Sequence, residues 1–246
     1  MKKSRIHEVR QLMDLYLAWR RNESHKPLKA ELLVTSKCNS CCLICNVWKL
    51  NDAKPELVQE ELATDEWVSL LEELSEMGTQ SIFISVGEPT LIDDLTGIIR
   101  FAKEKDICVD LVTNGFLVTK SLAEELVDCG VDRISFSIDA PIPEIHDEIR
   151  GIEGSWKRAI KAIKLVSNAR KETRSKTPKI NVSYVVTIKS YPYIEDMIDL
   201  KSDVGFDTIN FQPIIGKVSE ADRLFLKDED IKKLQQSLRG LRRKTQ

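Results

Sequence analysis

Four cysteines near the N-terminal end of the chain have the types and spacing needed for metal chemistry. Cys38, Cys41, Cys42 and Cys45 lie within the stretch TSKCNSCCLICN, directly after the apolar run at 28–34. Thiolates bind zinc and iron–sulfur clusters, so a thiolate-rich loop that leaves a strand indicates a metal site. Structural zinc usually takes four ligands from two C-x2-C pairs that are well separated in sequence, and no further pair follows this loop. Three thiolates on a four-iron cluster would leave one iron open to another ligand.

Two sets of three ligands are compatible with this loop. Cys38, Cys42 and Cys45 have the spacing C-x3-C-x2-C, whereas Cys38, Cys41 and Cys45 have the spacing C-x2-C-x3-C. The chain has three histidines, His7, His25 and His146. None of them has zinc-knuckle spacing to the cysteines, so histidine is not favoured as a fourth metal ligand. We expect these histidines to be surface or hydrogen-bonding residues.

Polar motifs follow three further apolar runs of the chain. They are Gly87-Glu88-Pro89-Thr90 after the run 81–86, Thr113-Asn114-Gly115 after 107–113, and Ser137-Ile138-Asp139 at the end of 131–138. Each motif alone is ordinary turn chemistry. Polar residues at the ends of successive strands, together with the cysteines, predict one shared pocket.

An alternation of strands and helices carries these motifs. The predicted strands are 28–34, 81–86, 107–113, 131–138, 180–187 and 208–212, and the predicted helices are 64–78, 91–105, 121–130, 155–171, 192–204 and 228–242. Apolar strands alternating with helices predict a parallel sheet covered by helices. Six such units are fewer than the eight of a closed barrel, so an α/β fold with either an open partial (βα)6 TIM-like barrel or a doubly wound layer is expected. Both architectures place the active site at the carboxyl ends of the strands.

Local signals refine these boundaries. Apolar residues at helical spacing predict a further helix over 6–19, ahead of the first strand. Thr64 is expected to cap its helix, and Ser121 and Glu124 are expected to form a capping box. The segment 139–154 is expected to be a long loop.

The composition is typical of a soluble globular protein. The chain has 246 residues, of which 42% are hydrophobic and 31% charged, with a formal net charge of −2 and a pI near 6.0. This balance gives no electrostatic footprint for nucleic acid. No apolar run is long enough to span a membrane and the start has no signal-peptide pattern, so we expect a cytoplasmic protein without a membrane partner. The remaining cysteines, Cys108 and Cys129, are expected to be a buried strand residue and a helix-end packing residue.

The order of these motifs resembles that of the radical S-adenosylmethionine (radical SAM) superfamily. The spacing of Cys38, Cys42 and Cys45 after the first strand resembles its signature, which favours Cys42 over Cys41 as the ligand. The other matching segments are Val86-Gly87-Glu88-Pro89, Thr113-Asn114-Gly115, Ser137-Ile138-Asp139 and His146-Asp147-x-x-Arg150-Gly151. The resemblance implies a partial (βα)6 TIM-like barrel core at 28–246, preceded by an N-terminal helical extension at 1–27.

The same resemblance implies the cofactors and the reaction. Cys38, Cys42 and Cys45 would hold a [4Fe–4S] cluster, and S-adenosylmethionine (SAM) would chelate its fourth iron. Reductive cleavage of SAM would give methionine and a 5′-deoxyadenosyl radical, which takes a hydrogen atom from an unidentified peptide or small-molecule cofactor precursor. A one-electron donor such as flavodoxin or ferredoxin is implied as a partner. No protein side chain is assigned as catalytic.

The resemblance also implies a set of SAM-binding residues. They are Gly87, Glu88, Pro89, Asn114, Ser137, Asp139 and Arg150. Within this set, Glu88 would accept hydrogen bonds from the SAM amine, and Arg150 is a candidate for the SAM carboxylate. Ser137 and Asn114 are candidates for the ribose or nearby polar groups, and the strand ends around Val185 and Pro213 would cover the adenine.

Several features depart from the family pattern. Val86 stands where a glycine is usual and would resist a positive φ, and Ile44 stands where an aromatic residue is common. No cysteine follows Cys129, so we expect a core without a cysteine-rich auxiliary-cluster domain: either one cluster suffices, or this chain is the core of a longer protein. The alternative function is a non-catalytic iron–sulfur or zinc-binding protein for electron transfer or scaffolding. An electron carrier has no need of the Glu88, Asn114 and Ser137 motifs.

Overall fold

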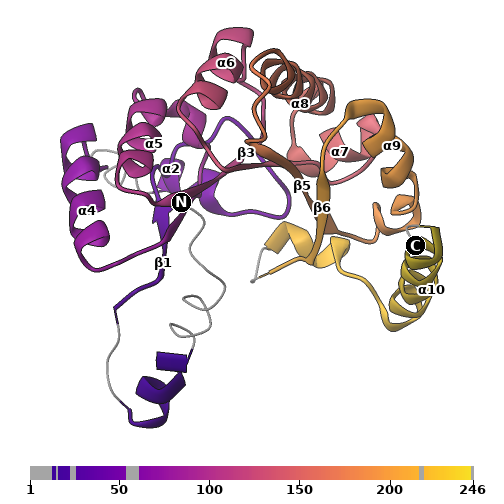
Figure 1. Cartoon of the computed structure of the whole chain (residues 1–246). Coiled ribbons are helices and arrows are strands. Elements are labelled where there is room, and N and C mark those ends of the chain that lie inside the picture. The colour runs from indigo at the N-terminus through magenta and orange to yellow at the C-terminus, as the bar shows by residue number, and fades with distance from the viewer. Residues whose placement is uncertain (1–12, 15, 23–25, 54–60, 216–218, 245–246) are drawn as a thin grey trace.

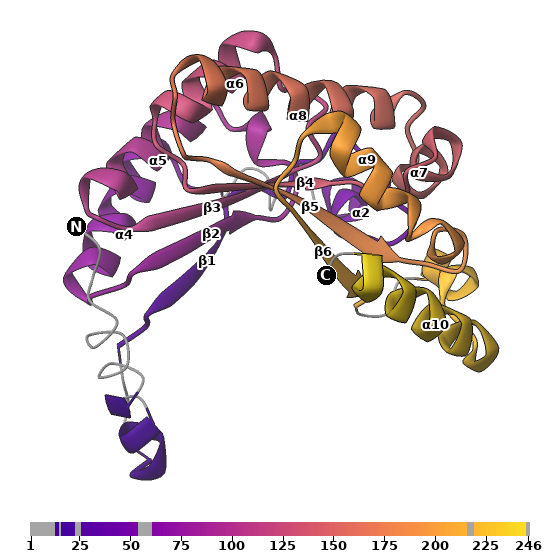
Figure 2. The same cartoon turned by 45° about the vertical axis from the view of Figure 1, so that its right-hand side comes forward.

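The computed structural model describes residues 13–14, 16–22, 26–53, 61–215 and 219–244. Within these residues, six parallel strands form one sheet in the order β1-β2-β3-β4-β5-β6 (Figures 1 and 2). The strands are β1 Lys29–Leu33, β2 Ser81–Ser85, β3 Cys108–Thr113, β4 Arg133–Ser137, β5 Lys179–Val186 and β6 Thr208–Pro213. The predicted partial barrel of six βα units is confirmed. Each strand pairs with its successor in sequence, so all strand ends that carry motifs meet at one edge.

Helices cover the convex face of this curved sheet, and the concave face stays open (Figures 1 and 2). The helices are α2 Val47–Ala53, α4 Thr64–Glu76, α5 Leu95–Glu104, α6 Lys120–Asp128, α7 Pro143–Arg150, α8 Ser155–Glu172, α9 Asp196–Val204 and α10 Asp228–Lys244. Three 3-10 turns join them: η1 Pro89–Leu91, η2 Tyr191–Tyr193 and η3 Ser219–Leu224. Residues 13–14 and 16–20 are helical, as predicted for that part of 6–19, and extend away from the sheet. Residues 1–12, including His7, lie outside the described residues, as does His25.

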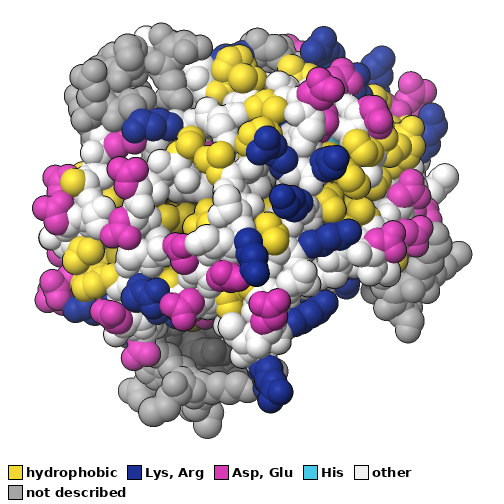
Figure 3. Space-filling model, turned by 90° about the horizontal axis from the view of Figure 1, so that it is seen from above, with side chains coloured by type: hydrophobic (Ala, Val, Ile, Leu, Met, Phe, Trp, Pro, Cys, Tyr) yellow, Lys and Arg dark blue, Asp and Glu magenta, His cyan; other side chains and the backbone are white. Residues whose placement is uncertain are grey.

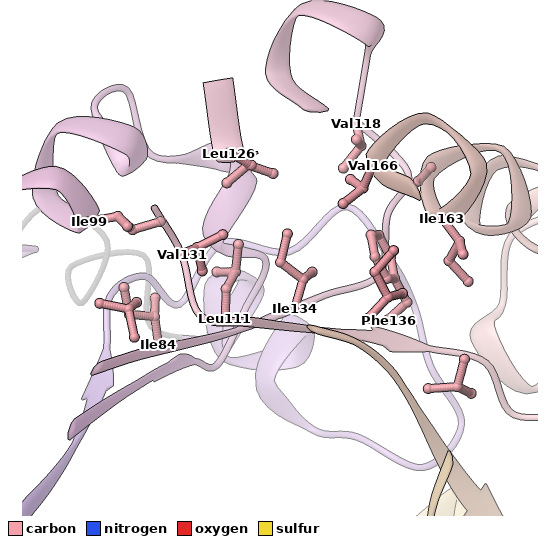
Figure 4. Packing of buried hydrophobic residues seen from close by; sticks show 14 of the residues in the cluster. Ile84, Ile99, Leu111, Val118, Leu126, Val131, Ile134, Phe136, Ile163 and Val166 are labelled. Atoms are coloured by element: carbon pink, nitrogen blue, oxygen red, sulfur yellow. The ribbon is translucent and has the colours of Figure 1, made fainter. Parts of the chain in front are cut away.

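The hydrophobic core lies between the sheet and its helices. Figure 4 shows Ile84, Leu111 and Phe136 pointing from the strands toward side chains such as Leu126 and Ile163 on the helices. All five are fully buried. Strand side chains alternate between the two faces, so one set builds this core and the other set lines the open concave face.

Cys108 belongs to the second set. It is exposed at the start of β3, whereas Val109 is buried. The expectation that Cys108 is a core residue is wrong, because it assumed a sheet covered on both faces. Cys129, at 3% exposure, is buried at the end of α6 as expected.

Two short helices were not predicted. α7 lies within the segment expected to be a loop, and α2 directly follows the cysteines. α7 begins at Pro143, ends at Gly151 in the left-handed conformation, and buries only His146 and Ile149. Because α7 buries only two residues, its sequence has too short a hydrophobic periodicity to predict a helix.

Two predicted helix caps are displaced. α4 begins after Ala63, whose N–H donates to Glu66 Oε2 at 2.8 Å, so Thr64 is the first helical residue and not the cap. Thr119 caps α6 by accepting a hydrogen bond from the Leu122 N–H at 3.2 Å. The capping box predicted at Ser121 is therefore wrong, because that residue lies two positions after the cap.

The outer surface carries a mixture of charges. Figure 3 shows Lys and Arg side chains interspersed with Asp and Glu side chains on the face seen from above. Among the described residues, no helix combines the length and the apolar character needed to cross a bilayer.

Candidate functional site

The three cysteines with C-x3-C-x2-C spacing line one cavity at the carboxyl ends of the strands. Cys38, Cys42 and Cys45 border a cavity of about 210 Å³. Gly87 and Glu88 after β2, Asn114 after β3, Ser137 at the end of β4 and Arg150 of α7 line the same cavity. The shared pocket expected from the strand-end motifs is thus found. Cys41 is exposed and does not line the cavity, which supports Cys42 as the ligand.

Polar contacts fix the two ends of the cysteine loop. Oε1 of Glu61 accepts hydrogen bonds from the Ser36 N–H (2.8 Å) and from the hydroxyls of Thr35 (2.9 Å) and Ser36 (3.0 Å). Burial opposes the charge of Glu61, but these donors outweigh it and lower the pKa of the carboxyl. At the other end, Trp48 Nε1 donates to the carbonyl oxygen of Cys42 at 3.1 Å.

The C-terminal turn of α7 holds the middle of the loop. The N–H groups of Cys41 and Leu43 donate to the carbonyl oxygens of Arg150 (3.2 Å) and Ile149 (2.8 Å). These carbonyls belong to the last turn of a helix, where they have no intrahelical partner. Gly151 follows with φ of 69°, and a Cβ there would lie 2.4 Å from the Cys41 carbonyl oxygen. Only glycine permits this approach of the loop to the helix end.

A sharp turn follows β2 and closes over the start of the same loop. Gly87 has φ of 62°, and a Cβ on it would lie 2.4 Å from the carbonyl oxygens of both Thr35 and Lys37. The Glu88 N–H donates to the Lys37 carbonyl at 2.8 Å. Val86 has φ of 66°, so it takes the left-handed conformation that a glycine would take freely. For a residue with a Cβ this costs about 1–2 kcal/mol.

Glu88 is held rigidly at the cavity wall. It is 1% exposed, and Oε1 accepts hydrogen bonds from the hydroxyls of Thr90 and Thr113, both at 2.6 Å. Oε2 accepts from the Asn114 N–H at 2.7 Å. A carboxylate oxygen has more than one lone pair, so Oε2 keeps capacity for a further donor in the cavity. Its predicted role toward the SAM amine stays a prediction.

Asn114 ties β3 to the cysteine loop. Its Nδ2 donates to Asn39 Oδ1 at 2.7 Å and to Ser40 Oγ at 3.2 Å, and its Oδ1 accepts from the Phe116 N–H at 2.9 Å. The side chain therefore positions the loop. The contact predicted between Asn114 and the ribose stays a prediction.

Arg150 connects the cavity with a buried carboxylate behind it. Its Nε lies 2.6 Å from Asp139 Oδ2, an ion pair without hydrogen-bond alignment, and its Nη1 lies 3.8 Å from Cys42 Sγ. Burial opposes the charge of Arg150, but Asp139 and Cys42 outweigh it and raise the pKa of the guanidinium, which stays protonated. Asp139 is 0% exposed and does not line the cavity.

Hydrogen bonds hold both the side chain and the backbone of Asp139. Oδ1 accepts a hydrogen bond from the Val185 N–H at 3.3 Å, and the Asp139 N–H donates to His146 Nδ1 at 3.1 Å. Burial, with a smaller contribution from Arg150, lowers the pKa of His146 well below its ordinary value. His146 is thus a neutral, buried hydrogen-bonding residue, not a surface residue.

Asp147, next in the chain, stabilises the following helix. Its Oδ1 accepts from the Ser155 hydroxyl and the Trp156 N–H, both at 2.8 Å, and its Oδ2 accepts from the Gly154 N–H at 2.6 Å. These contacts satisfy N–H groups at the start of α8. The residues of the segment His146–Gly151 therefore have distinct tasks, of which only that of Arg150 reaches the cavity.

The donor set fits an iron–sulfur cluster. Burial raises the pKa of the Cys38 thiol to about 11, and the neighbouring Cys42, Glu88 and Cys45 raise it further against the opposing Ser40 N–H. Burial also raises the pKa of Cys42, and Arg150 opposes this more strongly than Asp139 adds to it. Binding of a cluster must therefore displace protons from these thiols.

The thiols surround the cavity and do not converge on one point. Among the described residues, no three His, Cys, Asp or Glu side chains are close enough together for a single metal ion. In a four-iron cluster each thiolate binds a different iron, so thiols spread around a cavity suit it.

Two of the predicted SAM-binding residues do not line the cavity, and two residues that were not predicted do. Pro89 is buried at the start of η1 and, like Asp139, does not line the cavity, whereas Ser183 of β5 and Gln212 of β6 do. Gln212 Nε2 donates to Ser183 Oγ at 2.8 Å. Polar residues at alternate positions of the fifth and sixth predicted strands were the available signal. Val185 lines the cavity and Pro213 does not.

A second polar cavity of about 380 Å³ adjoins the first on the concave face of the sheet. Val112, Ser183 and Gln212 line both. The second cavity is also bordered by Asp110 of β3 and by Arg133 at the start of β4, whose charged groups lie 3.6 Å apart. Burial raises the pKa of Asp110, although Arg133 opposes the shift.

Comparison with known proteins assigns the fold to a family. A family profile described as the Radical SAM superfamily matches residues 32–212. The chain is 32% identical over 172 residues to an AdoMet-dependent heme synthase of Oleidesulfovibrio alaskensis, covering 70% of this chain and 42% of that protein. It is 26% identical over 183 residues to a PqqA peptide cyclase of Bradyrhizobium diazoefficiens, covering 74% and 45%.

A solved structure has the same fold. The crystal structure of Streptococcus suis SuiB bound to S-adenosylmethionine superimposes with a TM-score of 0.71 at 19% identity, covering 97% of this chain and 53% of that one. The chain thus spans about half the length of the relatives that it matches.

Proposed function

The chain belongs to the radical SAM superfamily, and we propose that it reductively cleaves SAM to methionine and a 5′-deoxyadenosyl radical that takes a hydrogen atom from its substrate. The cofactors of this family are a [4Fe–4S] cluster and SAM. One observation carries the proposal: three thiols and the residues after β2, β3 and β4 line a single cavity. We assign the cluster to Cys38, Cys42 and Cys45.

The residues around the thiols have tasks that suit SAM. Glu88, fixed by three neighbours, would accept hydrogen bonds from the cationic amine, a charge-assisted contact. Ser137 on β4 is available for the ribose, and Val185 for the adenine. Gly87 and Pro89 set the turn that aims Glu88. Together the cofactors supply a hydrogen-abstracting radical, and the protein orients the reactants and excludes water.

The substrate is proposed to lie in the adjoining cavity on the concave face. That cavity shares three residues with the cluster cavity and is lined largely by polar and charged side chains. A polar peptide or a small-molecule cofactor precursor suits such walls. Named relatives include both a peptide cyclase and a heme synthase.

We further propose an external one-electron donor and a two-part organisation. A flavodoxin or ferredoxin would deliver the electron to the cluster. The two cysteines outside the loop lie apart, Cys108 exposed on β3 and Cys129 buried at the end of α6. Residues 28–246 would form the core and residues 1–27 a helical extension. In the described part of that extension, Met13 (59%) and Trp19 (72%) are largely exposed.

Anaerobic reconstitution with iron and sulfide tests the function. We expect about four irons per chain, and 5′-deoxyadenosine on addition of SAM and dithionite. Cys42→Ala should lose the cluster, whereas Cys41→Ala, one residue away, should keep it and serves as the matched control. A reconstituted wild type that holds stoichiometric zinc and leaves SAM intact contradicts the proposal. The reverse outcome for the two variants reassigns the ligand.

A further inference from the structure

The buried pair behind the cluster cavity has a task that the SAM-binding residues do not explain. Asp139 and Arg150 lie eleven positions apart, on the segment after β4 and at the end of α7. The Arg150 side chain is 13% exposed and Asp139 is 0% exposed. Burying two charges costs free energy unless the pair and its surroundings compensate, so such a pair invites a functional explanation.

The geometry aims the cation of this pair at a cysteine. Nε of Arg150 meets Asp139 Oδ2 at 2.6 Å, and Nη1 on the far side of the fork lies 3.8 Å from Cys42 Sγ. A guanidinium is planar, so fixing one edge against the carboxylate also fixes the direction of the other edge. Asp139 itself is anchored by the Val185 N–H and by His146.

We propose that Asp139 positions Arg150 against Cys42 so that its positive charge raises the reduction potential of the cluster. The inference rests on the proposed function. A cluster held by three thiolates is anionic and gains negative charge on reduction, so a nearby cation stabilises the reduced state. Charge and hydrogen bonds at the ligand sulfurs are known determinants of cluster potential.

The main test replaces both charged side chains by neutral polar ones. In Asp139→Asn/Arg150→Gln no buried charge is left without a partner, so the fold has the best chance of survival. Iron content and the midpoint potential are measured by EPR-monitored redox titration in the absence of SAM. We expect the ratio of reduced to oxidised cluster at a fixed applied potential to fall about tenfold, which is about 59 mV for a one-electron couple.

A matched control is available on the same helix. Lys189 Nζ pairs with Glu148 of α7 at 2.6 Å, but these side chains are 38% and 47% exposed. Glu148→Gln/Lys189→Gln removes the same two kinds of charge at the solvent-exposed surface, where water screens them. Its potential should equal that of the wild type.

The outcomes separate this inference from its alternatives. If the charge-free variant keeps the wild-type potential without SAM, the inference is overturned, and weaker SAM binding in the same variant would then assign Arg150 to the SAM carboxylate. If that variant takes up no iron, the comparison of Arg150→Lys with Arg150→Gln decides: the lysine variant, which keeps a charge, should have the higher potential, and equal potentials in the two overturn the inference. A wild type that takes up no iron contradicts the proposed function itself.

Discussion

Two substitutions of Val86 test whether the backbone of the turn before Glu88 is strained. The residue has φ of 66°, where any Cβ is strained and only glycine is relaxed. We compare Val86→Ala with Val86→Gly, because both lose the valine side chain and differ only in the Cβ. Glycine relieves about 1–2 kcal/mol of left-handed strain and gives up about 0.4–1 kcal/mol through the greater freedom of the unfolded chain. Val86→Gly should therefore be more stable than Val86→Ala by about 1 kcal/mol.

The assay is thermal or urea unfolding of the metal-free chain, so that altered cluster binding does not enter. For a chain of this size 1 kcal/mol corresponds to about 2–4 °C in Tm. Val112 is the control: it also lines the cavity and is half-buried, but it lies within β3. There glycine should be less stable than alanine by about 0.5–1 kcal/mol. If Val86→Ala equals or exceeds Val86→Gly in stability, the strain at this turn is refuted.

Three further substitutions test other parts of the molecule. Asp147→Ala should lower the free energy of unfolding by about 2 kcal/mol, because it removes the acceptors at the start of α8; an unchanged urea midpoint would contradict this. Gly151→Ala should lower iron uptake on reconstitution, because its Cβ would lie 2.4 Å from the Cys41 carbonyl oxygen and push the loop away; uptake equal to the wild type would show that the loop can yield. Burial alone would raise the pKa of Asp207, but hydrogen bonds, chiefly from Arg170 at 2.5 Å, outweigh burial and lower the pKa below its ordinary value of 3.8. The Asp207 carboxylate therefore stabilises the fold above pH 3.8, and this stabilisation is lost as the pH falls through the pKa of the folded state. Asp207→Asn should thus cost about 2 kcal/mol at neutral pH in denaturant titrations, and a cost that persists in strong acid would refute the ionic origin.

The strands and the helices between them could be predicted from the sequence, because the strands are apolar runs that alternate with helical patterns. The residues left a partial barrel and a doubly wound layer open, and only the family resemblance favoured the sequential strand order that the sheet has. The motifs at the strand ends then had to meet, since parallel strands place their carboxyl ends at one edge. The exposure of Cys108 could not be predicted in the same way. A continuous apolar run normally means burial on both faces, and here the concave face is open, so Cys108 faces outward while Val109 is buried.

The sequence predicted which residues form the site better than it predicted the contacts among them. Arg150 was expected at the SAM carboxylate, and nothing in the spacing indicated that Asp139 would hold its Nε. That pairing depends on α7, a helix that buries only two residues and therefore leaves almost no periodic signal. Asn114 likewise belongs to the predicted pocket, but its side chain is bonded to Asn39 and Ser40 of the loop. Such contacts depend on tertiary geometry, which residue type and spacing do not specify.

The role of α7 explains why so short a helix matters to the site. Its last carbonyls accept hydrogen bonds from Cys41 and Leu43, and Arg150 from the same turn approaches Cys42. One rigid turn thereby sets both the path of the loop and the charge beside Cys42, a proposed cluster ligand. Any change that shifts α7 must then alter cluster retention and cluster potential together, whereas a change confined to Glu88 should alter SAM binding alone. The two sides of the cavity are therefore separable by experiment, although they lie within one pocket.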